Sequence, residues 1–181
     1  MNVSRGTIMK KYDVLIIGAG HAGVEAAIAS DRIGAKTALI SFKKSDLGVM
    51  SCNPAMGGLG KGHLIREIDA MGGVIGLASD HSGIQFRMLN RTRGEAVQGP
   101  RAQIDRDLYK ENIQRIVRNS GVELVEGEVR DIITERKSGN ESIIGVETST
   151  VGKLYCKKLV VTTGTFLSGV IYRGKEKWKA G

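Results

Sequence analysis

Residues 12–23 read YDVLIIGAGHAG, and this stretch decides which fold the sequence predicts. Its first six residues form a nearly continuous apolar run, which is typical of a strand buried on both faces of a parallel sheet. Three glycines with the spacing G-x-G-x-x-G follow at once: Gly18, Gly20 and Gly23. Such glycines let the backbone turn tightly and approach a pyrophosphate, which meets free N–H groups at the next helix. Alone the pattern is weak, because it also serves strand-to-helix turns without a ligand.

The residues after the glycines supply the context that the pattern needs. Residues 24–33 are good helix formers, Gly34 stands where a helix stop belongs, and residues 36–41 read as a second strand. Residues 12–41 therefore predict one βαβ unit. With a strand before the glycines and a helix after them, we predict an α/β, Rossmann-like domain with a parallel central sheet that binds a dinucleotide.

The end of the second predicted strand departs from the usual dinucleotide pattern. About 20 residues after the glycines an acid is expected to bind the ribose hydroxyls. Lys43 and Lys44 stand there instead, and the nearest acid is Asp46. Two lysines suit a 2′-phosphate, which leaves NADP open as a ligand. Residues 160–166, VVTTGTF, look like the returning strand of a large flavin-binding domain, whose Thr163-Gly164 turn lies near the cofactor, and this favours FAD.

The rest of the chain predicts further helices and strands. Apolar spacing predicts a helix within residues 59–73 and an amphipathic helix over residues 101–120. Residues 74–102 show no clean period and read as loop or irregular structure. Short β-rich runs between residues 122 and 164 predict an accessory β-rich segment.

Composition is that of a globular protein in a reducing compartment. Of the 181 residues 41% are hydrophobic and 25% charged, and no apolar run approaches the roughly 18 residues of a membrane span. The opening residues lack the apolar segment of a secretory signal, and two cysteines far apart make no disulfide framework. We expect a cytoplasmic protein with no membrane partner, consisting of a flexible tail over residues 1–9 and one domain over residues 10–181.

The formal net charge of +8 favours anionic partners. Five arginines concentrate this charge in the middle of the chain: Arg87, Arg91, Arg93, Arg101 and Arg106. The ending YRGKEKWKAG is a second basic stretch, in which four cations alternate with other residues around Trp178. A basic stretch is either a solvated face or a nucleic-acid-binding surface, and the residue types alone leave both readings open.

Residues 51–63, SCNPAMGGLGKGH, contain the most informative cysteine. They are not a phosphate-binding P-loop, because Ala55 and Gly62 occupy positions that require glycine and Ser or Thr. Cys52 lies in a glycine-rich loop near the expected ligand edge of the sheet, and a helix starting near Leu59 favours its thiolate. It is therefore a candidate nucleophile, with an inert buried thiol as the alternative. The histidines have no metal-site spacing with either cysteine, so no metal is expected.

These motifs, in this order, closely resemble the family of MnmG, also called glucose-inhibited division protein A. The resemblance runs from Tyr12 to the last residue and rests on GAGHAG, SCNPAMGGLGKGH, IQFRMLN at 84–90, GPRAQIDRDLY at 99–109 and TGTFLSG at 163–169. It implies an FAD-dependent enzyme that builds an aminomethyl or carboxymethylaminomethyl group on carbon 5 of the wobble uridine of tRNA. It also implies NADH as reductant, methylene-tetrahydrofolate as carbon donor, the GTPase MnmE as partner and a homodimer of the full-length protein.

The resemblance also implies roles for individual residues. The FAD phosphate loop corresponds to six consecutive residues: Gly18, Ala19, Gly20, His21, Ala22 and Gly23. Val129 matches a position that contacts the adenine half, and Asn53, Gly57 and Gly58 are expected beside the flavin ring. Cys52 matches a cysteine proposed to act on the uracil or on the flavin-bound carbon unit. The arginine-rich blocks then contact tRNA phosphates.

Family members are much longer, so the resemblance identifies this sequence as an N-terminal FAD-domain piece with an incomplete sheet. We expect such a piece to be inactive by itself, and to be unstable or to self-associate through uncovered apolar surface. Two other readings stay open from the residues. One is an FAD- or NADP-dependent reductase of a small molecule, and the other is a non-catalytic nucleotide- or RNA-binding fragment.

Overall fold

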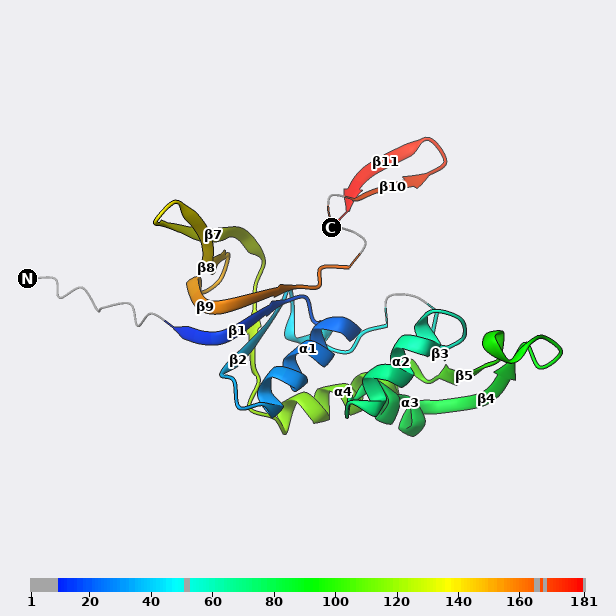
Figure 1. Cartoon of the computed structure of the whole chain (residues 1–181). Helices are drawn as coiled ribbons and strands as arrows, with labels where there is room; N and C mark the ends of the chain where they lie inside the picture. The colour runs from blue at the N-terminus through cyan, green and yellow to red at the C-terminus, as the bar shows by residue number, and fades with distance from the viewer. Residues whose placement is uncertain (1–9, 51–52, 165–166, 168, 181) are drawn as a thin grey trace, which may run out of the picture.

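A computed structural model of the chain describes residues 10–50, 53–164, 167 and 169–180 (Figure 1). Its main sheet has the strand order β6-β2-β1-β9-β8-β7. The strands are β1 Lys11–Ile17, β2 Thr37–Ser41, β6 Glu123–Glu126, β7 Val129–Lys137, β8 Asn140–Thr148 and β9 Gly152–Val161. β1 pairs in parallel with both β2 and β9, and β2 pairs in parallel with β6. This confirms the predicted parallel centre.

The β-rich segment extends this sheet on one side. β7, β8 and β9 follow one another along the chain and pair antiparallel, with a tight turn between β7 and β8. β9 therefore has two partners of opposite direction, the parallel β1 and the antiparallel β8. The accessory strands thus continue the Rossmann-like sheet instead of forming a separate layer.

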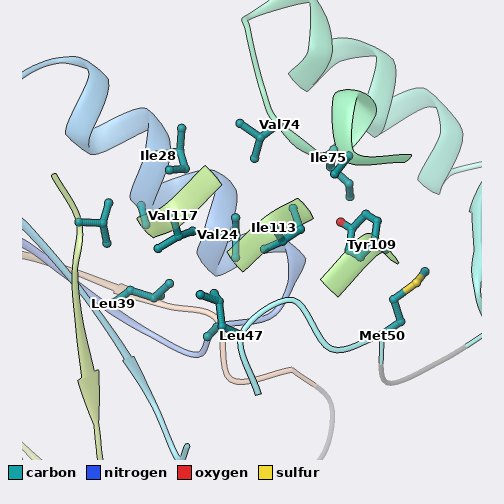
Figure 2. Packing of buried hydrophobic residues seen from close by; sticks show 14 of the residues in the cluster. Val24, Ile28, Leu39, Leu47, Met50, Val74, Ile75, Tyr109, Ile113 and Val117 are labelled. Atoms are coloured by element: carbon teal, nitrogen blue, oxygen red, sulfur yellow. The ribbon is translucent and has the colours of Figure 1, made fainter. Parts of the chain in front are cut away.

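The parallel strands have a hydrophobic cluster of buried residues on each of their two faces. β2 is buried at each of its five positions, as expected of a strand covered on both faces. On one face α1, His21–Arg32, and α4, Arg106–Arg118, pack together. Figure 2 shows Val24 of α1 beside Ile113 and Val117 of α4, with Leu39 of β2 beneath them.

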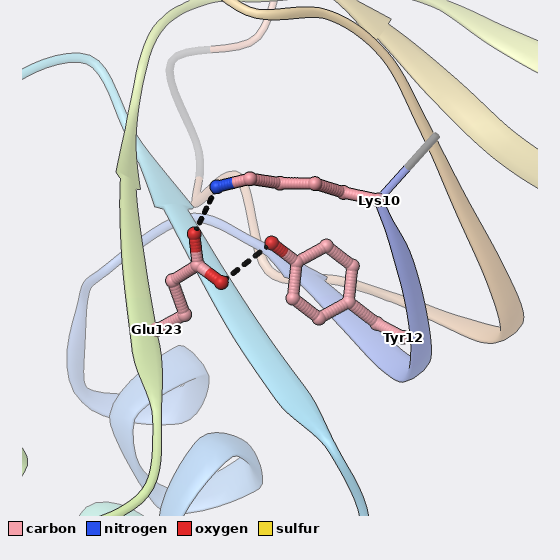
Figure 3. A network of polar contacts seen from close by, with 3 residues as sticks. All are labelled: Lys10, Tyr12 and Glu123. Atoms are coloured by element: carbon pink, nitrogen blue, oxygen red, sulfur yellow. Dashed lines mark hydrogen bonds and ion pairs between the residues drawn. The ribbon is translucent and has the colours of Figure 1, made fainter. Parts of the chain in front are cut away.

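A polar network ties together the amino ends of β1 and β6. Lys10 Nζ and Tyr12 Oη both donate to the carboxylate of Glu123, at 2.6 and 2.7 Å (Figure 3). The hydrogen bond from Lys10 lowers the pKa of Glu123 most strongly, the hydrogen bond from Tyr12 and the charge of Lys10 lower it further, and partial burial opposes them. Burial, together with Glu123, raises the pKa of Tyr12. The network therefore joins two strands that are separated in the sheet by β2.

Residues 53–105 form a second unit beside the helices. It contains β3 Ala55–Gly57, α2 Lys61–Ala70, α3 Ile75–Ser82, β4 Gly83–Leu89 and β5 Gly99–Ile104. β5 pairs antiparallel with both β3 and β4, giving a three-stranded sheet. Two short 3₁₀ turns complete the described chain, η1 Lys44–Asp46 and η2 Glu95–Val97.

The expectation of irregular structure over residues 74–102 was wrong. The segment contains α3, β4 and the start of β5, and the helix expected from residue 101 begins only at Arg106. β4 is exposed along most of its length, but its sequence does alternate apolar Ile84, Phe86 and Met88 with polar residues, and the prediction overlooked this period of two. α3 spans only eight residues, too few for a clear helical period.

A hairpin of β10 Gly169–Arg173 and β11 Glu176–Ala180 follows the main sheet and stands off from it in Figure 1. Gly174, with φ of 61°, opens its two-residue turn, where glycine meets no steric cost. Sequence periodicity did not predict this hairpin. Among the described residues, no helix combines the length and apolar character needed to cross a membrane.

Candidate functional site at the carboxyl edge of the sheet

The strand order creates a switch point between β1 and β9. From β1 the chain proceeds outward to β2 and β6 on one side, whereas β9 lies on the other side of β1. The loops after β1 and β9 therefore leave the same edge in opposite directions. In open α/β sheets, ligands bind in the crevice that such diverging loops create.

The three glycines after β1 meet three different environments. Gly18 has φ of 102°, and a Cβ there would collide with the carbonyl of Thr162. A Cβ on Gly23 would collide with the carbonyl of Gly18. At Gly20, by contrast, no atom of the described residues other than its chain neighbours lies within 4 Å of the position that a Cβ would take. Gly18 and Gly23 thus allow close packing of strand and helix, while Gly20 leaves an open side for a ligand.

The helix that follows these glycines begins at the same open side. Gly20 is the N-cap of α1 and no side chain caps the first turn. The first N–H groups of a helix have no intrahelical partner, and the helix dipole adds positive potential there. No acidic residue occupies the first turn of α1. An anion such as a pyrophosphate fits both the space and the donors.

Thr162, which sequence reasoning did not single out, fastens the two loops together. Its backbone N–H donates to the carbonyl of Ile17 at 2.8 Å, and its hydroxyl lies 2.8 and 3.0 Å from the carbonyls of Ile17 and Gly18. The predicted Thr163 and Gly164 follow at once and are exposed. The turn after β9 is therefore brought beside the glycine loop. β9 pairs with β1 over a long sequence distance. From the sequence, only the resemblance of residues 160–166 to the returning strand of a flavin-binding domain indicated this position.

His21 begins α1 and is held neutral by its surroundings. Its Nδ1 lies 3.1 Å from the hydroxyl of Tyr109, and the two rings meet edge to face with centroids 5.6 Å apart. Burial lowers the pKa of His21 to about 4, with a smaller contribution from the charge of Lys61. Ala19 is buried, whereas Ala22 is exposed on the first turn. At neutral pH His21 therefore adds no positive charge to the anion-binding side.

An acid that the sequence did not reveal lies beside the end of β2. The carboxylate of Glu126, the last residue of β6, accepts a hydrogen bond from the backbone N–H of Lys44 at 2.9 Å. β6 and β2 are neighbours only in the folded sheet, so this acid stands far from the expected sequence position. Val129 begins β7 half-buried and packs against the hydrophobic cluster that includes Leu15.

The loop of the candidate nucleophile is only partly described, and Cys52 itself lies outside the described residues. Before it, the backbone N–H of Gly48 donates to the carbonyl of Ala19 at 3.4 Å, and Met50 is buried. After it, Asn53 is exposed and Gly57 pairs with Arg101. The flanking residues thus lie beside the glycine loop at one end and in the second sheet at the other.

Gly57 and Gly58 have structural reasons to be glycine. Both have positive φ, 121° and 83°. A Cβ on Gly57 would collide with the carbonyl of Pro100, because β3 approaches β5 closely there. The N–H of Gly58 donates to the same carbonyl at 3.0 Å. Their expected place beside a flavin ring stays a prediction.

Two of the five predicted arginines face each other on the second sheet. Arg87 of β4 and Arg101 of β5 are directly opposite in the strand register. With Gln85, Leu89 and Gln103 they line a hollow of about 150 Å³. Among the described residues neither arginine forms an ion pair. Like charges directly opposite are unfavourable in a sheet, so the hollow suits an anion between them. We call this site the arginine hollow.

The other three arginines lie elsewhere. Arg91 and Arg93 are exposed in the connection between β4 and β5, where the side-chain amide of Gln98 donates to both of their carbonyls, at 3.4 and 3.0 Å. Arg106 is the first residue of α4. The basic stretch thus separates into the hollow, the far end of the β4–β5 hairpin and a helix start.

Comparisons with known proteins agree with this geometry. The family model of glucose inhibited division protein A matches residues 13–181. The tRNA uridine 5-carboxymethylaminomethyl modification enzyme MnmG of Aliarcobacter butzleri is 48% identical over 94% of the chain. A crystal structure of GidA from Aquifex aeolicus has a TM-score of 0.84 and 48% identity over 93% of the chain. The flavin-dependent brominase Bmp2 is similar at a TM-score of 0.59 and 25% identity over 88% of the chain.

The coverage of these relatives is unequal. The chain spans 27% of the length of both the Aliarcobacter butzleri protein and the Aquifex aeolicus chain, and 40% of the brominase. The similarity therefore concerns one part of much longer proteins, and the range that the family model matches includes the residues of the glycine loop and of the arginine hollow.

Proposed function

The chain belongs to the glucose inhibited division protein A family, and we propose that it forms the FAD-binding part of an enzyme that modifies the wobble uridine of tRNA. The observation that carries this proposal is the glycine loop at the switch point between β1 and β9. Gly18 and Gly23 are closely packed, whereas the space beside Gly20 is free of other described residues. Gly20 is also the N-cap of α1 and supplies no side-chain cap. This arrangement fits a dinucleotide pyrophosphate.

Several features favour FAD over NADP. The turn after β9 is fastened to the glycine loop by Thr162, in the way expected of the returning strand of a flavin domain. A similar fold occurs in a protein named as flavin-dependent. Lys43 and Lys44 keep the 2′-phosphate of NADP as the alternative, although Glu126 places a carboxylate against the backbone of Lys44. When bound, the flavin supplies hydride transfer, and the protein supplies orientation and electrostatics.

We assign the nucleophile to Cys52, on its place in the sequence between the glycine loop and the second sheet and on the family resemblance. Its thiolate would form a bond to carbon 6 of the uracil, and the electron pair of the ring double bond would move toward carbon 5. Carbon 5 would then form a bond to the methylene carbon of the one-carbon unit, and the electron pair of the carbon–nitrogen bond that carried this carbon would move to the nitrogen. Loss of the proton from carbon 5 restores the double bond and expels the thiolate. Asn53, Gly57, Gly58, Thr163, Gly164 and Val129 are the further proposed cofactor contacts.

The tRNA is proposed to meet the basic surface of the second sheet. The arginine hollow offers two guanidinium groups that form no ion pair with any described residue, and these suit one phosphate between them. Arg91, Arg93 and Arg106 supply further positive charge. The name of the Aliarcobacter butzleri relative supports tRNA as substrate. A cytoplasmic location follows from that substrate.

The remaining assignments rest on the family resemblance. They are NADH as reductant, methylene-tetrahydrofolate as carbon donor, MnmE as partner and a homodimer of the full-length protein. The regions of the relatives beyond the matched part are where we place these functions.

The absorbance spectrum of the purified chain tests the cofactor, and transfer of its residues into a full-length relative tests the reaction. We expect bound flavin in the chain, and loss of wobble-uridine modification on substitution Cys52→Ser with flavin retained. Normal modification by the cysteine variant would remove the nucleophile assignment. Tight binding of tRNA without flavin would favour the non-catalytic RNA-binding alternative, and flavin without any tRNA binding would favour the small-molecule reductase.

A further inference from the structure

We propose that the β10–β11 hairpin binds unpaired nucleotides of the RNA substrate through one of its two faces. This inference rests on the proposed tRNA function and adds a second RNA contact, separate from the arginine hollow. The binding face carries Tyr172, Lys177 and Lys179, with Lys175 at the turn, and we call it the lysine–tyrosine face.

The strand register separates the side chains of the hairpin into two unlike sets. Tyr172 lies opposite Lys177, and Val170 lies opposite Lys179. Residues directly opposite in an antiparallel pair share a face, and neighbours along a strand alternate between faces. The other face therefore carries the pairs Ile171 with Trp178 and Arg173 with Glu176.

The two faces of the hairpin differ in how much positive charge can interact with an anion. Arg173 donates to the carboxylate of Glu176 through two nitrogens, at 2.6 and 3.0 Å, so its charge is largely matched. The carboxylate on that face also repels phosphate. The described ion pairs include none of the lysines of the lysine–tyrosine face, and these lysines are exposed. Phosphates are therefore expected on this face.

Tyr172 favours the binding of unpaired nucleotides over that of a duplex. The Tyr172 side chain is 68% exposed, and Lys177 Nζ lies 5.7 Å from its ring centroid. The cation covers one side of the ring at most, which leaves the other side for a stacked base. Bases in a duplex are already stacked on each other, whereas those of a loop are free to stack on an aromatic ring.

The opposite face of the hairpin, which carries Ile171 and Trp178, is expected to contact protein and not RNA. Ile171 and Trp178 are each 43% exposed there and form an apolar strip. A two-stranded hairpin is marginally stable alone, so contact of this strip with other protein surface would hold the hairpin while the lysine–tyrosine face stays outward. If protein instead covered the lysine–tyrosine face, RNA would not reach it, and the experiment below detects that outcome.

Trp178 provides a local probe, because it is the only tryptophan of the 181 residues. The chain is titrated with a tRNA anticodon stem-loop and, separately, with an RNA duplex of equal length. We expect the stem-loop to change Trp178 emission in a saturable way. Tyr172→Ala should weaken stem-loop binding about tenfold or more and leave duplex binding unchanged, while Tyr172→Phe should retain both. Lys177→Gln with Lys179→Gln should weaken both RNAs.

Matched variants separate this inference from the proposed function. Lys153→Gln, an exposed lysine on β9, should have little effect, and circular dichroism checks that each variant keeps the fold. Unchanged binding in the hairpin variants, together with weakened binding in Arg87→Gln with Arg101→Gln, would overturn the hairpin site and leave the tRNA function standing. Absence of RNA binding by the unaltered chain at low salt would overturn both.

Discussion

Gly18, Gly20 and Gly23 share a residue type but not a physical role. Gly18 and Gly23 lie where a side chain would strike backbone carbonyls, so their absence of a Cβ is a condition of folding. Gly20 has an ordinary negative φ of −76° and empty space beside it. Packing among the described residues therefore does not require glycine at position 20, and the open space beside it is where we place the ligand.

This difference predicts opposite outcomes for two substitutions. Gly20→Ser supplies a good N-cap side chain for α1, so stability should stay the same or rise by a few tenths of a kcal/mol, while flavin affinity falls. Gly23→Ala should lower both, because its Cβ strikes the carbonyl of Gly18. Urea unfolding and flavin titration measure the two effects. Equal flavin affinity in Gly20→Ser and the unaltered chain would contradict the assigned phosphate loop.

His21 predicts a pH dependence of stability. Its pKa is lowered from 6.5 to about 4 in the folded chain, chiefly by burial. The unfolded chain therefore binds the proton first, and stability present above pH 6.5 is lost as the pH falls toward 4. At about 1.4 kcal/mol per pKa unit, the loss is on the order of 3 kcal/mol. Urea midpoints at several pH values should show this slope, and His21→Gln should remove it; an unchanged slope would assign it to other groups.

The contacts between elements explain what sequence reasoning found and what it missed. The βαβ unit was predictable because its strand, glycines and helix follow one another locally. Thr162 and Glu126 were not, because they reach the site through strand pairings over long sequence distances. β4 and β5 were missed although each alternates polar and apolar residues over a short stretch, because the glycines and Pro100 between and within them favoured an irregular reading.

Glu25 shows how one helix fixes the start of another. Its carboxylate accepts hydrogen bonds from the backbone N–H groups of Val74, at 2.9 and 3.2 Å, and Ile75, at 2.6 Å, where α3 begins. Glu25→Ala should destabilise the fold by about 1–3 kcal/mol, because these part-buried donors lose a charged acceptor. Glu128→Ala, which removes an exposed carboxylate in the connection between β6 and β7, is the control. Equal denaturant midpoints for the two variants would contradict this role.

At the scale of the whole molecule, the two edges of the main sheet serve different purposes. The amino edge holds the network of Lys10, Tyr12 and Glu123, which joins strands to one another (Figure 3). The carboxyl edge carries the open glycine loop and the turn after β9. At the amino edge, polar side chains thus form hydrogen bonds with one another. At the carboxyl edge, we propose that the backbone N–H groups at the start of α1 bind a ligand.

The second sheet carries Arg87 and Arg101, and neither forms an ion pair with a described residue. Removing them should therefore separate stability from RNA binding. Arg87→Gln with Arg101→Gln relieves repulsion between opposite positions, so the fold should be equally or slightly more stable. If both arginines contact phosphates, the slope of log affinity for tRNA against log salt should fall by about 1.5 to 2. Arg130→Gln with Arg136→Gln, exposed on β7, removes equal charge and should leave the slope nearly unchanged. Equal slopes for the two double variants would mean that the arginine hollow acts only through net charge and holds no phosphate.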